Sequence, residues 1–317
     1  MEANTHGVKI DKLLKEVYQC FEAGDFLGAE HLLDEAHAVD FENSEIQTAM
    51  KACGFWMQRL QKIKTVAGDE ARGNYLCESW NAFNERYRDI SEHPLKLGRM
   101  RLNIWVHTEA LHYFHAQAEK TDDPETILQI ARCHKELGSY DYAVKCYEYL
   151  LQKLEDKDVR CMAELADAYV LIGELKAGKV LMREALFLDS AKVELNKLKA
   201  PLFTELISRV KKECPITSPV FNEWLLVYGI YWCVLDVRRE LSSVEYGNLK
   251  QMIYTSRSEL AEGDSGGWLT PRLVNCYFRL MDHLEITESD RKEIEDIRLN
   301  IQLTAPALYN SSVRGAG

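Results

Sequence analysis

The stretch ETILQIARCHKELGSYDYAVKCYEYLLQKLEDKD (125–158) is followed directly by VRCMAELADAYVLIGELKAGKVLMREALFLD (159–189). When Gly138 is placed on Gly173, the two segments superpose with a period of 173 − 138 = 35 residues. Apolar residues recur at helical spacing on both sides of each glycine. A repeat of this length indicates a helix–turn–helix unit that is copied in tandem.

A third copy lies near the N-terminus, where YQCFEAGDFLGAEHLLDEAHAVD (18–40) brings Gly24 into the same register. Apolar residues at helical spacing precede it, so we expect a helical hairpin over 8–39. One hairpin cannot bury its own apolar face, and several copies therefore imply a stack of hairpins.

The copies share small and apolar residues at matching distances from their glycine. The middle copy has Ile127, Ile130, Ala131, Tyr140, Ala143, Tyr147 and Leu150. The last copy has Met162, Leu165, Ala166, Tyr169, Leu175, Gly178, Met182 and Ala185, and the first has Phe26, Ala29, Leu33 and Ala36. On these residues, which span about a third of the chain, the sequence resembles the tetratricopeptide repeat family. Small residues there mark the places where two helices cross closely.

The resemblance implies an all-α, right-handed helical-repeat superhelix, here with a C-terminal helical extension. In this family the first helix of each unit lines a concave groove that holds a peptide or helix of a partner protein. By resemblance, the partner-binding groove residues are Tyr18, Phe21, Leu128, Arg132, Lys135, Arg160, Glu164 and Asp167. The lysine and asparagine pattern with which some members clamp a terminal carboxylate is missing here.

The remainder of the chain also has helical periodicity. Two prolines in the segment CPITSP (214–219) mark the main expected boundary. Beyond them one long helix is predicted from Phe221 to about Leu241. The predicted divisions are an N-terminal hairpin plus helix (1–66), central repeats with a capping helix (67–213), a C-terminal helical region (214–303) and a mobile tail (304–317).

Composition narrows the class of protein. The formal charge of −11 makes a nucleic acid an unfavourable partner. The 9 cysteines are scattered without a C-x-x-C pair, which favours a reducing compartment. No apolar run reaches the length of a signal peptide or a membrane span, so a cytoplasmic protein is expected.

Sequence motifs nominate no enzyme. The segment GDSGG (263–267) is similar to the nucleophile segment of chymotrypsin-type proteases, but helical flanks indicate a loop between two helices. His107, His112 and His115 share one predicted helix without further ligands at a metal-binding spacing. No phosphate-binding glycine loop, dinucleotide fingerprint or H-E-x-x-H is present. We therefore expect no cofactor and no metal.

The repeats favour a non-enzymatic scaffold that binds a peptide or helix of another protein. A second hypothesis is a structural subunit that assembles into a complex, or into a homo-oligomer, through its aromatic C-terminal helices. Trp224, Tyr228, Tyr231, Trp232 and Trp268 motivate it, because aromatic residues dominate interface cores. A third is an enzyme or small-molecule receptor with a site between the two halves.

Overall fold

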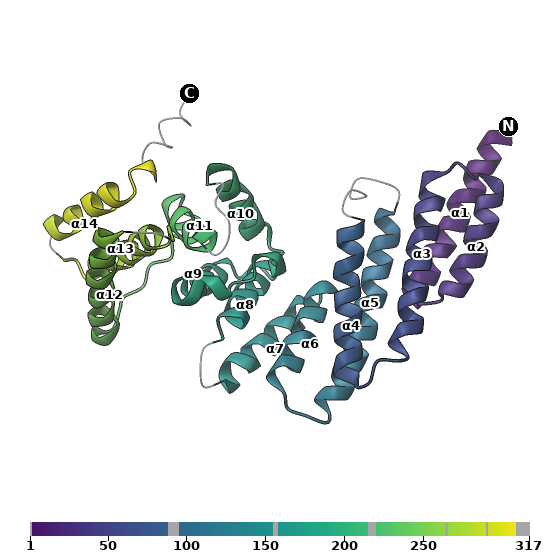
Figure 1. The fold of residues 1–317 in the computed structure, drawn as a ribbon, viewed down its shortest axis with the longest axis horizontal. Helices are drawn as coiled ribbons and strands as arrows, with labels where there is room; N and C mark the ends of the chain where they lie inside the picture. Colours follow the sequence, from purple (N-terminus) through teal and green to yellow (C-terminus); the bar gives the residue numbers. More distant parts are fainter. Residues whose placement is uncertain are drawn as a thin grey trace. The chain divides into compact units, whose positions relative to one another are not determined.

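The computed structural model describes residues 2–87, 95–154, 158–214, 220–263, 266–289 and 291–308 (Figure 1). Within these ranges the chain forms 14 α-helices and no strand, as the sequence predicts. It divides into two compact units, residues 1–146 and 147–317. No helix of the described residues is long and apolar enough to cross a membrane.

The N-terminal unit is built from successive helices that pack on their neighbours. They are α1 (Glu2–Ala23), α2 (Phe26–Val39), α3 (Ser44–Ile63), α4 (Asp69–Arg86), α5 (Lys96–Ala118) and α6 (Pro124–Glu136). In this unit α1 packs against α2 and α5, and α4 packs against α5. Buried aromatic rings fill the core, with Trp105 packed edge-on against both Phe26 and Trp56 at 4.8 and 5.4 Å. The helix α7 (Tyr140–Lys153) spans the division between the units.

The three aligned glycines occupy the same turn conformation. Gly24, Gly138 and Gly173 have φ angles of 72°, 77° and 93°, in the left-handed region. In each case the next residue's N–H donates to the carbonyl five residues before it: Asp25 to Cys20 at 2.9 Å, Ser139 to His134 at 2.9 Å and Glu174 to Tyr169 at 2.8 Å. This is the Schellman helix end. The repeated hairpins therefore share one turn, while their assembly into a right-handed superhelix stays a prediction.

The C-terminal unit continues with α8 (Val159–Leu171), α9 (Leu175–Asp189), two short 3₁₀ turns (Ser190–Lys192 and Leu195–Lys197), α10 (Pro201–Glu213), α11 (Val220–Tyr231), α12 (Ser243–Glu262), α13 (Leu269–Ile286) and α14 (Arg291–Thr304). α8 and α9 lie side by side, as do α12 and α13 (Figure 1). α11 packs against both α9 and α13. It therefore forms the centre of this unit.

The main boundary lies elsewhere than the sequence suggests. Val159 on α8, Leu226 on α11 and Ile301 on α14 all belong to one hydrophobic core. The described residues on both sides of segment 215–219 therefore belong to one compact unit, and the segment itself lies outside the described ranges. The shared core of the flanking helices overrides the local sequence signal for a boundary.

Two further expectations about the C-terminal half are wrong in detail. α11 ends at Tyr231 instead of near Leu241, because Cys233 takes a left-handed φ of 57° and the chain turns back. The start of the predicted tail is ordered, since Ala305 and Leu308 are buried in the core. Residues 309–317 lie outside the described part of the chain.

Candidate functional site

The structure buries most of the groove residues predicted for the N-terminal unit. Tyr18 and Phe21 belong to its core, and the Tyr18 hydroxyl donates to Glu45 Oε1 at 2.5 Å. Leu128 and Lys135 are also buried, and Arg132 is half-buried. A partner could therefore reach Arg132 more readily than the other four.

The last copy's predicted residues have intramolecular partners. Arg160 is half-buried and pairs with Asp158 at 2.9 Å, at the start of α8. Glu164 is buried and accepts a hydrogen bond from the Tyr147 hydroxyl at 2.9 Å.

Asp167 is fully buried and holds the connection into α10. Its carboxylate accepts hydrogen bonds from the backbone N–H of Lys199 at 2.9 Å and of Ala200 at 2.8 Å. Polar residues on the repeat's inner positions thus serve the packing of this unit.

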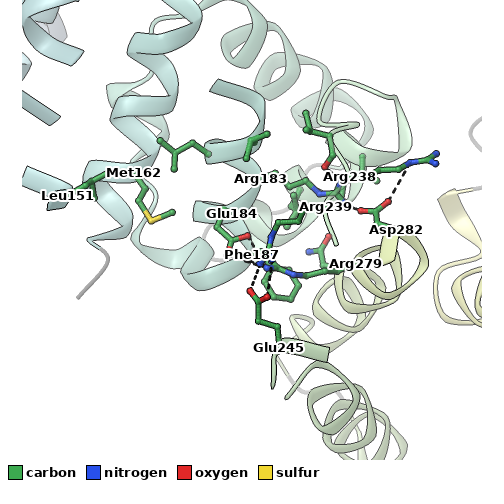
Figure 2. Close-up of a pocket in the computed structure, with 16 residues that line it drawn as sticks. Leu151, Met162, Arg183, Glu184, Phe187, Arg238, Arg239, Glu245, Arg279 and Asp282 are labelled. Carbon is green, nitrogen blue, oxygen red and sulfur yellow. Dashed lines mark hydrogen bonds and ion pairs between the residues drawn. The ribbon is translucent and has the colours of Figure 1, made fainter. Parts of the chain in front are cut away.

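A different concave site lies in the C-terminal unit, over α11 and between α9 and α13. It is a cavity of about 440 Å³, within the usual size range of ligand sites. Figure 2 shows Leu151 and Met162 at one end and the charged side chains at the other. Its lining residues are Leu151, Met162, Val180, Leu181, Arg183, Glu184, Phe187, Leu226, Ile230, Val237, Arg238, Arg239, Glu245, Asn275, Arg279 and Asp282.

Helix periodicity places the lining side chains of each helix on the face that meets the cavity. On α9, Val180, Glu184 and Phe187 recur at spacings of four and three, which is one face of a helix. Asn275, Arg279 and Asp282 do the same on α13. α11 contributes the apolar side chains Leu226 and Ile230 beneath them.

Two ion pairs on the inner walls are largely buried. Arg183 pairs with Asp282, and their side chains are only 11% and 10% exposed. Arg279 pairs with Glu184 at 3.0 Å and also lies over the Phe187 ring, with Cζ 4.1 Å from its centroid. Burial lowers the pKa of Arg183 and raises the pKa of Asp282, while their mutual attraction opposes both shifts. These two ion pairs connect α9 to α13 and stabilise the walls of the cavity.

The pocket rim carries the accessible charges. Arg239 donates to both carboxylate oxygens of Glu245, at 2.6 and 3.1 Å, and the two side chains are 38% and 43% exposed. Arg238 is 56% exposed and contacts Glu285 at 2.6 Å. The hydrogen bond from Arg239 lowers the pKa of Glu245 to about 2, and the same contact raises the pKa of Arg239. Both rim partners stay charged near neutral pH.

Asn275 presents an unsatisfied acceptor at the lining. Its side chain is 1% exposed, and its Nδ2 donates to the Glu223 carbonyl at 3.1 Å and to Glu223 Oε2 at 3.0 Å. No group of the described residues hydrogen-bonds to Asn275 Oδ1. An amide flip would point that oxygen at the Glu223 acceptors, so the observed orientation is the favourable one.

Buried polar contacts fix the helices around the cavity. Glu223 on α11 also accepts a hydrogen bond from Ser190 Oγ at 2.8 Å. Its neighbour Asn222 donates to the carbonyls of Ser190 and Val193 at 2.7 and 3.0 Å. These contacts connect α11 to the end of α9 and, through Asn275, to α13. These buried hydrogen bonds hold the helices around the cavity in place, although Asn275 Oδ1 has no partner among the described residues.

The other motifs singled out in the sequence lie elsewhere. Gly263 ends α12 and Gly267 precedes α13, so the protease-like segment connects two helices, with residues 264–265 outside the described ranges. His107 is buried, with Nδ1 2.9 Å from the Asn103 carbonyl oxygen. No group of three or more His, Cys, Asp or Glu side chains in the described ranges is placed to hold a metal ion.

The C-terminal aromatic residues mostly contact one another. Tyr228 is buried and packs against Trp224 and Trp232, with ring centroids 5.9 and 4.8 Å apart. Trp224 and Trp232 are half-buried, and Arg209 covers the Trp232 ring at 3.8 Å. Trp268 alone among these four is strongly exposed, at 48%.

The sequence does not reveal this cavity, because its pattern predicts an unbroken helix through the residues of the rim. Val237, Arg238 and Arg239 lie in the irregular segment after α11, where an unbroken helix was expected. The adjacent arginines in VRRE (237–240) were the available signal. In comparisons with known proteins, neither a protein-family model nor a curated protein matches this chain.

Proposed function

We propose that this protein is a non-enzymatic scaffold that binds a short segment of a partner protein, and that the cavity between α9 and α13 receives it. The observation that supports this proposal is the two-sided lining of the cavity. Apolar side chains from α7, α8 and α11 meet exposed arginines within about 440 Å³. An apolar pocket with a few placed polar groups is the usual form of a binding site.

The helical hairpins give the proposal its second support. Repeated hairpins make rigid frameworks whose surfaces serve recognition of extended or helical peptides. The braced walls of the cavity fit a preformed site, because little conformational entropy is lost when a rigid surface binds.

A pocket-filling variant tests the proposal. Val180 lines the cavity and is 39% exposed, so Val180→Trp should fill the space without disturbing the core. Leu175→Trp is the matched control, since Leu175 lies on the same helix, is 53% exposed and does not line the cavity. Peptides selected on the wild-type chain from a phage-displayed library should lose binding to Val180→Trp and keep binding to Leu175→Trp.

The groove predicted from the repeats makes a contrasting prediction. If that groove holds the partner, Arg132→Glu and Arg160→Glu should abolish binding of the selected peptides, and Val180→Trp should not. The far-ultraviolet circular dichroism spectrum of each variant confirms that it is folded. Retained binding by Val180→Trp would overturn the proposal for the α9–α13 cavity.

A further inference from the structure

The charges at the rim indicate what the cavity binds, an inference that rests on the proposed function. The inner arginines have buried carboxylate partners: Arg183 has Asp282, and Arg279 has Glu184. Breaking such a pair leaves an uncompensated buried charge, which is strongly unfavourable. A ligand would therefore meet these groups as fixed, neutralised pairs.

Arg238 and Arg239 differ from the inner arginines because they are accessible. Arg239 and its partner Glu245 are 38% and 43% exposed, and an exposed ion pair of this kind contributes little to stability. Arg239 also lies 3.5 Å from the inner carboxylate of Glu184. Arg238 contacts Glu285, which is 15% exposed, and lies 3.8 Å from Asp282. Exchange of one carboxylate for another at such a site costs little free energy. A guanidinium group also binds a carboxylate through two parallel hydrogen bonds, as Arg239 binds Glu245.

We propose that the cavity binds a peptide segment in which an apolar side chain lies next to a carboxylate, and that Glu245 occupies the carboxylate's place on Arg239 until the peptide displaces it. The apolar side chain enters the end formed by Leu151 and Met162. Glu245 thus competes with the peptide carboxylate for Arg239 and so sets the affinity of the cavity for the peptide.

Asn275 favours a peptide over a fatty acid as the source of that chemistry. Its buried Oδ1 has no hydrogen-bond partner among the described residues and needs a donor. A peptide backbone supplies N–H groups beside the side chain that enters the pocket. A fatty acid carries the same apolar chain and carboxylate but has no N–H to offer.

The experiment measures the binding of fluorescein-labelled peptide pools by fluorescence anisotropy. Three amidated pools carry a fixed Leu-Glu, Leu-Gln or Leu-Lys pair among neutral polar residues. A fourth pool has no acidic side chain and ends in leucine with a free carboxylate. Comparison of the Leu-Glu pool with the fourth pool distinguishes a side-chain carboxylate from a chain terminus, and decanoate as a competitor tests the fatty acid.

We expect at least one carboxylate pool to bind about tenfold more tightly than the Leu-Gln pool, the lower range for hydrogen bonds to charged groups. Glu245→Gln should raise the affinity for the carboxylate pool severalfold, because the internal competitor loses its charge. Glutamine still completes the capping box that Ser242 and Glu245 form at the start of α12, so the helix is retained. Arg239→Gln should erase the preference for carboxylate. Arg257→Gln, an exposed arginine on α12 outside the cavity, should change nothing.

The outcomes separate this inference from the proposed function. If all pools bind equally to the wild type and none binds to Val180→Trp, the peptide site is supported and the carboxylate preference is overturned. An unchanged affinity in Glu245→Gln would overturn the displacement of Glu245. No binding of any pool to the wild type or to Glu245→Gln would refute the peptide site itself, and binding of decanoate alone would do the same.

Discussion

Substitution of the three turn glycines by alanine tests the repeated hairpin with internal controls. Gly24, Gly138 and Gly173 share a left-handed φ and the same hydrogen bond after the turn, but their surroundings differ. A Cβ at Gly138 or Gly173 would have no neighbouring atom within 4 Å. At Gly24 it would overlap Nε1 of Trp105 and lie 2.9 Å from Cδ1 of the same ring.

These surroundings set the expected magnitudes. A left-handed alanine costs roughly 1–2 kcal/mol, partly offset by about 0.4–1 kcal/mol from the lower entropy of the unfolded chain. Gly138→Ala and Gly173→Ala should therefore each lower the free energy of unfolding by about 1 kcal/mol. Gly24→Ala adds overpacking against a buried indole, which costs about 1–3 kcal/mol more.

Urea unfolding monitored by circular dichroism measures these differences, with amide hydrogen exchange to assign each transition to its unit. Gly54→Ala is the control, because Gly54 lies within α3 with no atom within 4 Å of the added Cβ. It should raise stability by about 0.5–1 kcal/mol, the difference in helix propensity. Equal losses for Gly24→Ala and Gly138→Ala would refute the close approach of Trp105. Stabilisation by Gly138→Ala and Gly173→Ala would refute the left-handed turn.

Three further predictions concern the C-terminal unit. Asp167→Ala should lower the free energy of unfolding in urea by about 3 kcal/mol, because two backbone donors lose a buried carboxylate, and Asp167→Asn should lower it less. Asp282→Asn should destabilise by about 3 kcal/mol, while Arg183→Met combined with Asp282→Leu should recover most of that loss in the same assay; a double variant as unstable as the single one would contradict this. The folded-state pKa of Glu245 is depressed from 4.5 to about 2, so its stabilising effect is complete above pH 4.5 and is lost as the pH falls through about 2. The difference in unfolding free energy between the wild type and Glu245→Gln, measured by urea titration from pH 7 to 2, should follow this course.

The sequence allowed most helices to be predicted because their local signals agree with the packing. The period of 35 residues predicts α6 to α9, and the aligned glycines mark the turns within the two hairpins. Ala29, Ala143 and Ala185, three of the small residues in the pattern, are fully buried. Periodicity and glycine are local properties of the chain, so one sequence suffices to recognise them.

The site could not be predicted in the same way, because its residues come from separate elements. Leu151 on α7, Arg183 on α9, Arg239 after α11 and Asp282 on α13 line one cavity, and α11 packs against both α9 and α13. No local pattern records that packing. The end of α11 was missed for a related reason: Cys233 adopts a positive φ that the sequence gives no glycine to signal. Without that turn, Arg238 and Arg239 would continue a helix instead of forming a rim.

The overall acidity of the chain bears on the choice of ligand at this rim. A formal charge of −11 repels an acidic peptide at distances beyond the pocket, where screening by salt is incomplete. At the cavity the charges are balanced, since the four lining arginines are matched by the three lining carboxylates and by Glu285, the partner of Arg238. Under the proposal, attraction therefore operates only at short range, after the peptide has placed its carboxylate against Arg239. Under this arrangement acidic segments in general gain nothing from their charge, and binding depends on an apolar side chain and a carboxylate reaching the same pocket together. If the proposed function holds, that requirement is how this acidic chain would discriminate among acidic partners.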